Sequence, residues 1–371
     1  MIFWNDSQGH NLSPLTAPWG RWPGGRLTLT TATPVTTSDV TGVSTVYYTP
    51  YISDLMSLWN GVSWQTLTFS EISTNIGAGS GFAQTRLTVA GTTTASSPVV
   101  TMTSTAGLAI GDLLDLSANF MGDAAIMAIN SGTQVTMSKN CLAGGGGNYT
   151  LYFYIPVFDF FASFDANQNV VLTSQPWASQ TTRTTALALT DGFYTLSTDK
   201  TKLYLGTLAF SQVHLNVCYA SDSAVFRGVW NNFNRVPRSM LFQSATTNWT
   251  YTGGWRQANG DPTAKVTWVR GLNEDPVPLE VMCCLNSGTS TAGNVNIGLD
   301  SATVGSADNC PEVSATNPGG LIGVCRTVYH HPVAPGYHYA TWMENTRVGP
   351  ITFYGNYGGN WTSCLRGTVW G

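Results

Sequence analysis

The amino-acid sequence predicts an all-β protein, built from antiparallel β-sandwich or jelly-roll-like domains with one short helix. No long apolar stripe recurs at the helical period of about 3.6 residues, whereas short alternating or aromatic runs recur between Gly, Pro, Asn and Asp. Only 10% of the 371 residues are charged, against roughly 25% in typical soluble domains. A surface covered by Ser, Thr, Asn and Gly fits β proteins that work outside cells or inside large assemblies, and it fits cytoplasmic enzymes poorly.

The expected strands follow one another along most of the chain. Their β-branched and aromatic residues favour strands, as in RLTLTT, STVYYTPY, VSWQTLTF, KLYLGTLAF, KVTWVRGL, PLEVMCCL and NVNIGLD. Turn dipeptides punctuate the chain at Asn60-Gly61, Asp191-Gly192, Gly253-Gly254 and Asn259-Gly260. Alternation of apolar and polar residues favours antiparallel sheets with one solvated face.

Composition divides the chain into five segments. Two glycine-rich stretches, 75–84 and 143–149, bracket a part with its own character, in which INSGTQVTMS predicts a hairpin with Ser131-Gly132 at its tip. We expect this part to be a small β-module inserted into a parent domain, because insertions are accepted at exposed loop tips. The predicted segments are an N-terminal docking segment at 1–25, the first part of a β domain at 26–85, the inserted module at 86–152, the continued β domain at 153–220 and a C-terminal β-sandwich domain at 221–371.

One segment, Ser221–Met240, reads as a short helix. Ser221 or Asp222 could cap its N-terminus. Its aromatic residues Phe226, Trp230 and Phe233 would share one face at i, i+4 and i+7. We therefore expect a short helix near 221–240 that docks its aromatic face on a sheet.

Charge and hydropathy exclude several classes of partner. The net charge is −4, and the twelve arginines are spread from Arg21 to Arg366, so we expect no binding to nucleic acid. The sequence contains no run of 18 apolar residues, so we expect no insertion into a membrane. The N-terminal residues lack the pattern of a Sec signal peptide, so we expect assembly in a host cytoplasm and release by lysis or as part of a particle.

The seven cysteines do not form a metal-binding or redox motif. They are Cys141, Cys218, Cys283, Cys284, Cys310, Cys325 and Cys364, with no C-x-x-C spacing. Without a signal peptide, reduced and mostly buried thiols are expected. A disulfide among Cys310, Cys325 and Cys364 is the alternative if the assembled product meets air.

Histidines and carboxylates provide weak candidates for chemistry. His330, His331 and His338 lie in YHHPVAPGYHY, but adjacent residues of a strand point to opposite faces, so packed histidines are favoured over a metal site. Glycoside hydrolysis would need a carboxylate pair, for which Asp159 with Asp165 and Glu274 with Asp275 are the candidates. Because such pairs arise by chance and NEDP reads as a turn, we predict no catalytic residue, no cofactor and no metal.

Two further features of the sequence can be explained without assigning a catalytic or cofactor-binding role. The stretch GAGSG at Gly77–Gly81 lacks the strand–loop–helix context of a phosphate loop, so it is read as a linker. The thirteen tryptophans can build a β core or, where exposed, stack on sugars and anchor interfaces.

Several long stretches resemble structural proteins of tailed bacteriophages. They are Arg26–Ser73, Thr181–Leu208, VWNNFNRVPRSM with NWTYTGGWRQANGDPTAKVTWVRGL, and the tail APGYHYATWMENTRVGPITFYGN with LRGTVWG. The middle module is similar to small β-modules of phage fibre and tail proteins through TSTAGLAIGDLL and INSGTQVTMS. The resemblance implies a tail-fibre, head-fibre or decoration component of a virion, expected to form a homotrimer, and carries no catalytic motif that could be transferred here.

Three functions are compared on this basis. The preferred prediction is a fibre-like, spike-like or decoration protein of the virion, with capsid, portal or tail proteins as partners and a host-surface glycan as a further one. The first alternative is a tailspike-type polysaccharide depolymerase, which the lack of a β-helix period and of carboxylates disfavours. The second alternative is an extracellular carbohydrate-binding protein, which the lack of a signal peptide disfavours.

Overall fold

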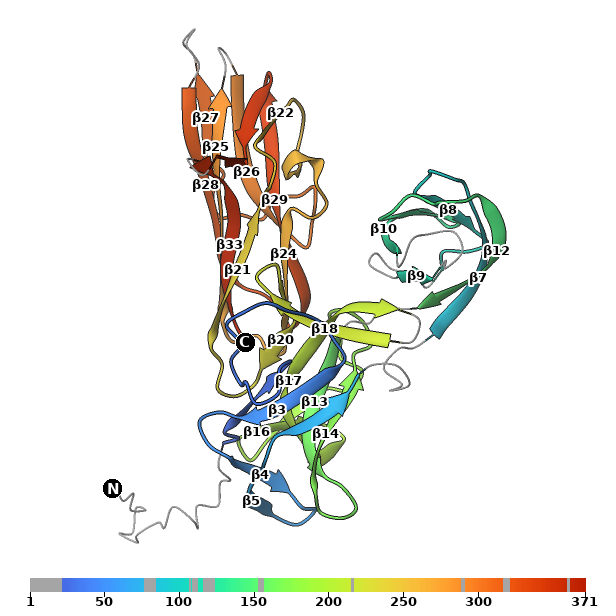
Figure 1. The fold of residues 1–371 in the computed structure, drawn as a ribbon, viewed down its shortest axis with the longest axis vertical. Helices are drawn as coiled ribbons and strands as arrows, with labels where there is room; N and C mark the ends of the chain where they lie inside the picture. The colour runs from blue at the N-terminus through green and yellow to red at the C-terminus, as the bar shows by residue number, and fades with distance from the viewer. Residues whose placement is uncertain are drawn as a thin grey trace.

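The protein is built almost entirely from β-strands (Figure 1). The computed structural model describes residues 22–76, 85–106, 108, 113–115, 124–152, 157–214, 217–287, 291–315, 321–358 and 361–371. The one helical element within these ranges is the 3-10 turn η1, Ala258–Gly260. The all-β prediction with antiparallel sheets is thereby confirmed. No helix in the described ranges is long and apolar enough to cross a membrane.

Two sheets enclose a core in the N-terminal half of the body, which we call the N-terminal sandwich. The short sheet β1-β3-β6 packs against the sheet that contains β13 and β17, and the core between them includes Leu27, Tyr48, Phe160 and Phe210. The strands of this part are β1 (Gly25–Thr28), β2 (Val40–Val43), β3 (Thr45–Pro50), β4 (Leu55–Trp59), β5 (Trp64–Thr68), β6 (Ile72–Asn75), β13 (Val157–Phe164), β14 (Val170–Pro176), β15 (Leu187–Thr190), β16 (Phe193–Leu196), β17 (Asp199–His214), β18 (Val217–Ser223), β19 (Phe226–Arg227) and β20 (Val229–Asn231).

A six-stranded closed barrel lies between β6 and β13 in the sequence and stands to one side of the N-terminal sandwich in Figure 1. Its order is β10-β11-β8-β7-β12-β9, and β9 closes the ring by pairing with β10. The predicted hairpin is confirmed, but its tip is Gly132-Thr133, one residue later than predicted, since Ser131 pairs with Gln134. The strands are β7 (Thr85–Thr93), β8 (Val99–Met102), β9 (Leu113–Asp115), β10 (Ala124–Ser131), β11 (Gln134–Met137) and β12 (Gly145–Tyr152). The five segment boundaries proposed from composition stay predictions, and the segment 1–25 lies mostly outside the described residues, as does Gly77–Gly81.

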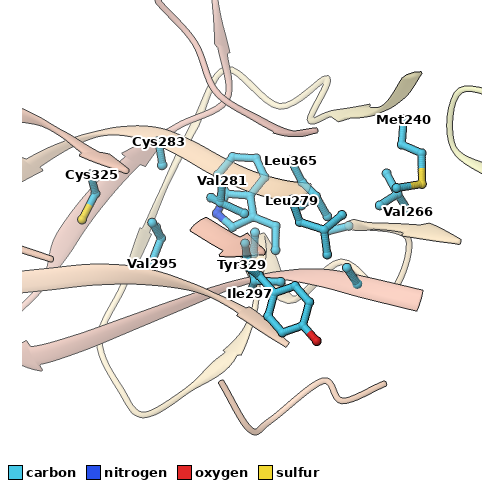
Figure 2. Packing of buried hydrophobic residues seen from close by; sticks show 14 of the residues in the cluster. Met240, Val266, Leu279, Val281, Cys283, Val295, Ile297, Cys325, Tyr329 and Leu365 are labelled. Carbon is cyan, nitrogen blue, oxygen red and sulfur yellow. The ribbon is translucent and has the colours of Figure 1, made fainter. Parts of the chain in front are cut away.

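Two long sheets form the C-terminal sandwich, whose core is shown in Figure 2. Strand β25 buries every second residue, including Leu279, Val281 and Cys283, so the period of two reads directly as a core face. Opposite it lie Val295 and Ile297 of the second sheet. The strands are β21 (Pro237–Gln243), β22 (Asn248–Tyr251), β23 (Arg256–Gln257), β24 (Lys265–Arg270), β25 (Pro276–Ser287), β26 (Thr291–Leu299), β27 (Glu312–Ala315), β28 (Leu321–Pro332), β29 (Gly336–Val348), β30 (Ile351–Tyr354), β31 (Asn356–Tyr357), β32 (Trp361–Thr362) and β33 (Cys364–Trp370).

The two sandwiches share one continuous sheet. Strand β19 pairs with β24 in parallel, the one parallel pairing among the described strands, and this joins the β13–β17–β18 side to the β24–β29–β26 side. A third core cluster lies at this junction and includes Trp177, Tyr204, Trp230 and Leu272. Since apolar residues from both sandwiches pack there, the junction is a packed interface.

The helix predicted near 221–240 is wrong. Ser221–Ser223 ends β18, and the short strands β19 and β20 and the start of β21 follow, joined by turns and loops. Backbone pairing decides the outcome, because Trp230 lies opposite Thr207 of β17 while Phe226 lies opposite Thr267 of β24. At Gly228 an added Cβ would lie 2.2 Å from the Ser221 carbonyl oxygen, which shows how closely the neighbouring strand approaches. Tertiary strand pairing has overridden the helical spacing of the three aromatics.

The predicted turn at Asp191-Gly192 is confirmed as a two-residue hairpin. Thr190 pairs with Phe193, and the two central residues have φ of 53° and 86°. Positive φ at both positions is the mark of a type I′ turn, which Asp-Gly favours.

All seven cysteines are free thiols, and five of them are buried. Cys283 lies opposite Cys325 in the register of β25 and β28, while Cys364 lies opposite Met282. Burial raises the pKa of Cys283 well above its ordinary value, which suppresses the reactive thiolate. No pair among Cys310, Cys325 and Cys364 is bridged here.

We expect native alkylation to separate these thiols by exposure. With iodoacetamide at pH 8, the exposed Cys310 reacts first, and Cys283 and Cys325 react only after unfolding in guanidinium. Peptide mass spectrometry of timed samples measures this order. Equal rates at Cys283 and Cys310 in the folded protein would contradict the packing of β25 against the core.

Candidate functional site

The three clustered histidines are held in separate interactions. His331 Nε2 lies 2.6 Å from Asp308 Oδ1, and His338 Nδ1 lies 2.7 Å from Asp300 Oδ2. His330 is exposed, and its backbone N–H donates to Asp308. Within the described ranges, no group of three or more His, Cys, Asp or Glu side chains could hold a metal ion.

His338 is a buried structural histidine. Its Nε2 lies 2.9 Å from the Ala334 carbonyl oxygen, and its Nδ1 faces the Asp300 carboxylate. Both ring nitrogens therefore face acceptor oxygens. The ring also lies 6.0 Å from that of Trp268, and it closes the loop between β28 and β29.

The candidate carboxylates Asp159 and Asp165 lie far apart and have separate partners. Asp159 lies inside β13, while Asp165 follows the strand and its Oδ1 accepts from the backbone of Asn167 and Asn169. Six extended residues span about 20 Å, whereas glycosidase carboxylates lie roughly 5–9.5 Å apart. Hydrogen bonds from Asn169 lower the pKa of the half-buried Asp165, as expected of a turn-capping aspartate.

Asp159 is part of a buried ion pair that joins the two sandwiches. Arg183 Nε donates to Asp159 Oδ2 at 2.6 Å, and Arg183 Nη2 donates to the Gly271 carbonyl oxygen at 2.7 Å. Thr207 donates to Asp159 at 2.7 Å. The guanidinium lies 4.4 Å from the Trp177 ring centroid, so packing and charge hold it in one place.

The second candidate carboxylate pair, Glu274 and Asp275, shares one arginine. Arg235 Nη2 lies 2.5 Å from Glu274, and its Nη1 contacts Asp275. The pair lies in the turn between β24 and β25, as the NEDP composition indicated. This bridge ties that turn to the segment after β20.

A cluster of three arginines around Asp222 was not predicted from the sequence. Arg238 Nη2 lies 2.6 Å from Asp222 Oδ2, and Arg227 Nη1 lies 3.5 Å from Asp222 Oδ1. Arg26 donates to the carbonyl oxygen of Gly371 at 2.8 Å. Burial raises the pKa of Asp222, against the opposing effect of Arg238 and Arg227. Burial and the nearby Arg238 lower the pKa of Arg26 to about 10.

This arginine cluster fastens the first strand to distant parts of the chain. Asn231 reinforces it, because its side chain accepts from the Leu27 N–H at 2.6 Å and donates to the Leu27 carbonyl oxygen at 3.2 Å. The sequence signal for such braces is indirect: in a chain with few charges, arginines within apolar segments are candidates for buried pairing.

Glu344 is a fully buried carboxylate in the C-terminal sandwich. It accepts from Trp249 Nε1 at 2.6 Å, from Arg256 Nε at 2.8 Å and from the backbone of Asn259. Burial raises its pKa, while the hydrogen bonds from Trp249 and Arg256 oppose the rise. Its partners hold the loop that contains η1 against β29.

The tryptophans divide between core and surface. Trp177, Trp230, Trp268 and Trp342 are fully buried, whereas Trp22 and Trp370 are exposed. Trp59 and Trp64 are half-buried, 5.8 Å apart, with Lys200 Nζ 3.4 Å from the Trp59 ring centroid. Asp191 accepts from both Lys200 and Trp64 Nε1, so this aromatic–cation patch is already satisfied within the chain.

Glu280 forms pH-dependent ion pairs with Arg366 and Arg326 on the outer face of the C-terminal sandwich. Burial raises its pKa, but hydrogen bonds from Arg366 and Arg326 outweigh burial and lower the pKa below its ordinary value. A lowered carboxylate pKa stabilises the fold above the unfolded-state pKa, and that stability is lost as pH falls through the folded-state pKa.

We therefore expect Glu280→Gln to destabilise the protein at pH 7 by no more than about 1 kcal/mol, because both arginines are largely exposed. The difference from the parent protein shrinks towards pH 3. Urea unfolding of both proteins at the two pH values measures this. A loss that is equal at pH 3 and pH 7 would contradict the ionic role of Glu280.

Comparisons with known proteins give only remote similarities. No protein-family model matches the chain, and no curated protein sequence is significantly similar to it. A structure of infectious bursal disease virus Gx strain aligns at 12% identity and a TM-score of 0.21, covering 78% of this chain and 72% of that one. The VP2 subviral particle of that virus aligns at 10% identity and 0.22, covering 77% and 76%.

An exo-β-1,3-galactanase from Phanerochaete chrysosporium with galactose aligns at 11% identity and a TM-score of 0.16, covering 99% of both chains. The proteins in these alignments include viral capsid proteins and a glycosidase. At such TM-scores none of them carries an argument about this chain.

Proposed function

We propose that this protein is a structural component of a tailed-phage virion, fibre-like, spike-like or a decoration protein, that contacts the host surface. The observation that supports this proposal is that the buried carboxylates of the protein form ion pairs within the fold. In the described part of the chain, Asp159, Asp222 and Glu344 are the buried acidic residues, and each is bonded to arginine. These carboxylates brace distant segments of the fold and are not free for chemistry.

Buried ion pairs between distant segments suit a virion protein, which must stay folded outside a cell. The contact between Arg26 and Gly371 joins residues 345 positions apart, and Arg183 reaches from the N-terminal sandwich to Gly271 of the other. Opening either sandwich breaks buried contacts, and a high barrier to such opening is what kinetic stability requires. The resemblance of several long segments to phage structural proteins supports the same proposal.

Mass spectrometry of purified particles tests membership of the virion. Peptides of this chain should co-purify with the particles through a density gradient and withstand a high-salt wash. An abundant host cytosolic protein measured in the same fractions controls for carry-over. A chain that is found only in the soluble lysate would overturn the proposal.

We expect the purified protein to form a homotrimer. Ile322 and Val324 of β28 are 49% and 62% exposed, and partner subunits of a trimer would cover part of such apolar surface. Size-exclusion chromatography with light scattering should give a mass near three times the 39.7 kDa of the chain. A clean monomer at micromolar concentration would contradict the trimer.

A further inference from the structure

Two cysteine thiols meet at the edge of the C-terminal sandwich, where the segment after β26 runs alongside β28. Asn309 is bonded to β28 twice: its Nδ2 donates to the Arg326 carbonyl oxygen at 3.2 Å, and its Oδ1 accepts from the Val328 N–H at 2.8 Å. These bonds hold the segment against the strand. The next residue, Cys310, is thereby brought beside Cys325 of β28.

Both sulfur atoms lie against the same part of β26. Cys310 Sγ donates to the Val295 carbonyl oxygen at 3.6 Å, and the backbone of Val295 also hydrogen-bonds to Cys325 (Figure 2). Cys325 Sγ lies 2.9 Å from the carbonyl oxygen of Pro311, the residue directly after Cys310. Neighbouring extended segments lie about 4.7–4.9 Å apart, which is within the roughly 4.4–6.8 Å between Cα atoms that a disulfide spans.

The two thiols differ in their access to solvent. Cys310 is exposed, whereas Cys325 is buried. Burial raises the pKa of Cys325 to about 11, and burial also raises the pKa of Cys310 against a hydrogen bond from Asn296. Of the two, Cys310 can be reached by a dissolved oxidant, while Cys325 has only to reach its neighbour. An exposed thiol beside a second thiol is the arrangement in which exchange ends in an internal disulfide.

We propose that Cys310 and Cys325 form a disulfide when the folded protein meets a low-molecular-weight disulfide as oxidant. The Cys310 thiolate attacks one sulfur of the oxidant, so that a mixed disulfide forms and one small thiol leaves. The Cys325 thiolate then attacks Cys310 Sγ, the bond to the small molecule breaks, and the second small thiol leaves. Two electrons pass from the protein sulfurs to the oxidant, and the two thiol protons end on the released thiols.

Two other cysteines compete for Cys325 and are disfavoured by their positions. Cys283 lies opposite Cys325 in the register of β25 and β28, but it is fully buried and cannot meet the oxidant first. Cys364 lies on β33, which pairs with β25 on the side away from β28. The sequence left Cys310, Cys325 and Cys364 as alternatives, and the fold selects the first two.

The bond would close a covalent loop from residue 310 to residue 325 around β27. Among the described strands, β27 pairs with β26 alone, over four residues. A cross-link across this interval restricts the unfolded chain and thereby stabilises the fold. The passage from a reducing cytoplasm to oxidising surroundings, in which the bond would form, rests on the proposed function; the thiol chemistry itself does not.

Incubation of the purified protein with oxidised glutathione at pH 8.5 tests the proposal. Remaining thiols are blocked with N-ethylmaleimide in guanidinium, and the proteases Glu-C and Asp-N together place Cys310 in peptide 308–312, Cys325 in 313–344 and Cys283 in 281–299. We expect peptides 308–312 and 313–344 to be linked. The linked form should exceed Cys310 carrying glutathione by at least about tenfold, since a neighbouring thiol acts at millimolar effective concentration.

Three variants act as controls. Cys310→Ser, at an exposed position, should yield no linkage, and Cys325→Ser should stop at glutathione on Cys310. Cys364→Ser should form the linkage like the parent protein. The oxidised parent should also melt about 5 °C or more above the reduced parent, a difference that Cys310→Ser should lack.

The inference is overturned if Cys310 stays free or keeps glutathione, or if Cys325 is linked to Cys283 or Cys364 instead. It is also overturned if protein unfolded in guanidinium forms as much of the linkage as folded protein. An oxidised protein that melts no higher than the reduced one would refute the stabilising role. If Cys325→Ser does not fold, as judged by circular dichroism, the peptides of the parent and of Cys310→Ser decide. Presence in the particle is a separate measurement, so failure of one proposal does not imply failure of the other.

Discussion

Arg183→Met is expected to lower the free energy of unfolding by about 3–5 kcal/mol, because it leaves Asp159 buried without its counter-charge. Asp159 has a side chain only 4% exposed, and its remaining bond is the one from Thr207. The substitution also removes the bond to Gly271 that crosses between the sandwiches. Urea unfolding at pH 7 and fixed protein concentration, followed by tryptophan fluorescence, measures the loss.

A double variant separates the charge from the packing. Arg183→Met combined with Asp159→Leu removes both charges, and should recover most of the stability, since replacing a buried ion pair by apolar groups is often neutral. Arg347→Met, at an exposed pair, should change stability by less than about 1 kcal/mol. A loss below 1 kcal/mol for Arg183→Met alone would mean that Asp159 reaches solvent or is protonated.

The fold class follows from local sequence properties. The β-branched and apolar run PLEVMCCL predicted a strand, which is β25, and Asp191-Gly192 predicted a turn, which is of type I′. Both depend only on neighbouring residues. The segment 221–240 failed because its backbone bonds go to β17 and β24, which no local pattern reveals.

The partners of the buried charges could not be predicted for the same reason. Asp159 was recognised as a candidate, but its partner Arg183 lies 24 positions away and across the sheet. The choice of Cys325 as the partner of Cys310 depends likewise on where the segment after β26 lies against β28. The sequence thus identifies the few charged residues in apolar segments, while the fold determines which partners their side chains bond to.

The side chain of Trp342 is expected to make a large contribution to the stability of the C-terminal sandwich. The residue is fully buried in β29, within the core between the two sheets, and its ring lies 5.9 Å from that of Trp249. Trp249 in turn donates to the buried Glu344. Removal of the indole therefore opens a cavity beside a buried carboxylate.

We expect Trp342→Ala to cost about 3–5 kcal/mol, from lost burial and the cavity that remains. Trp342→Phe is the matched control: it keeps a ring and removes an indole N–H that has no partner in the fold, so its cost should stay below about 2 kcal/mol. Urea unfolding measures both variants. If Trp342→Ala lost no more stability than Trp342→Phe, the side chain of Trp342 would not be packed in the core between the two sheets as described.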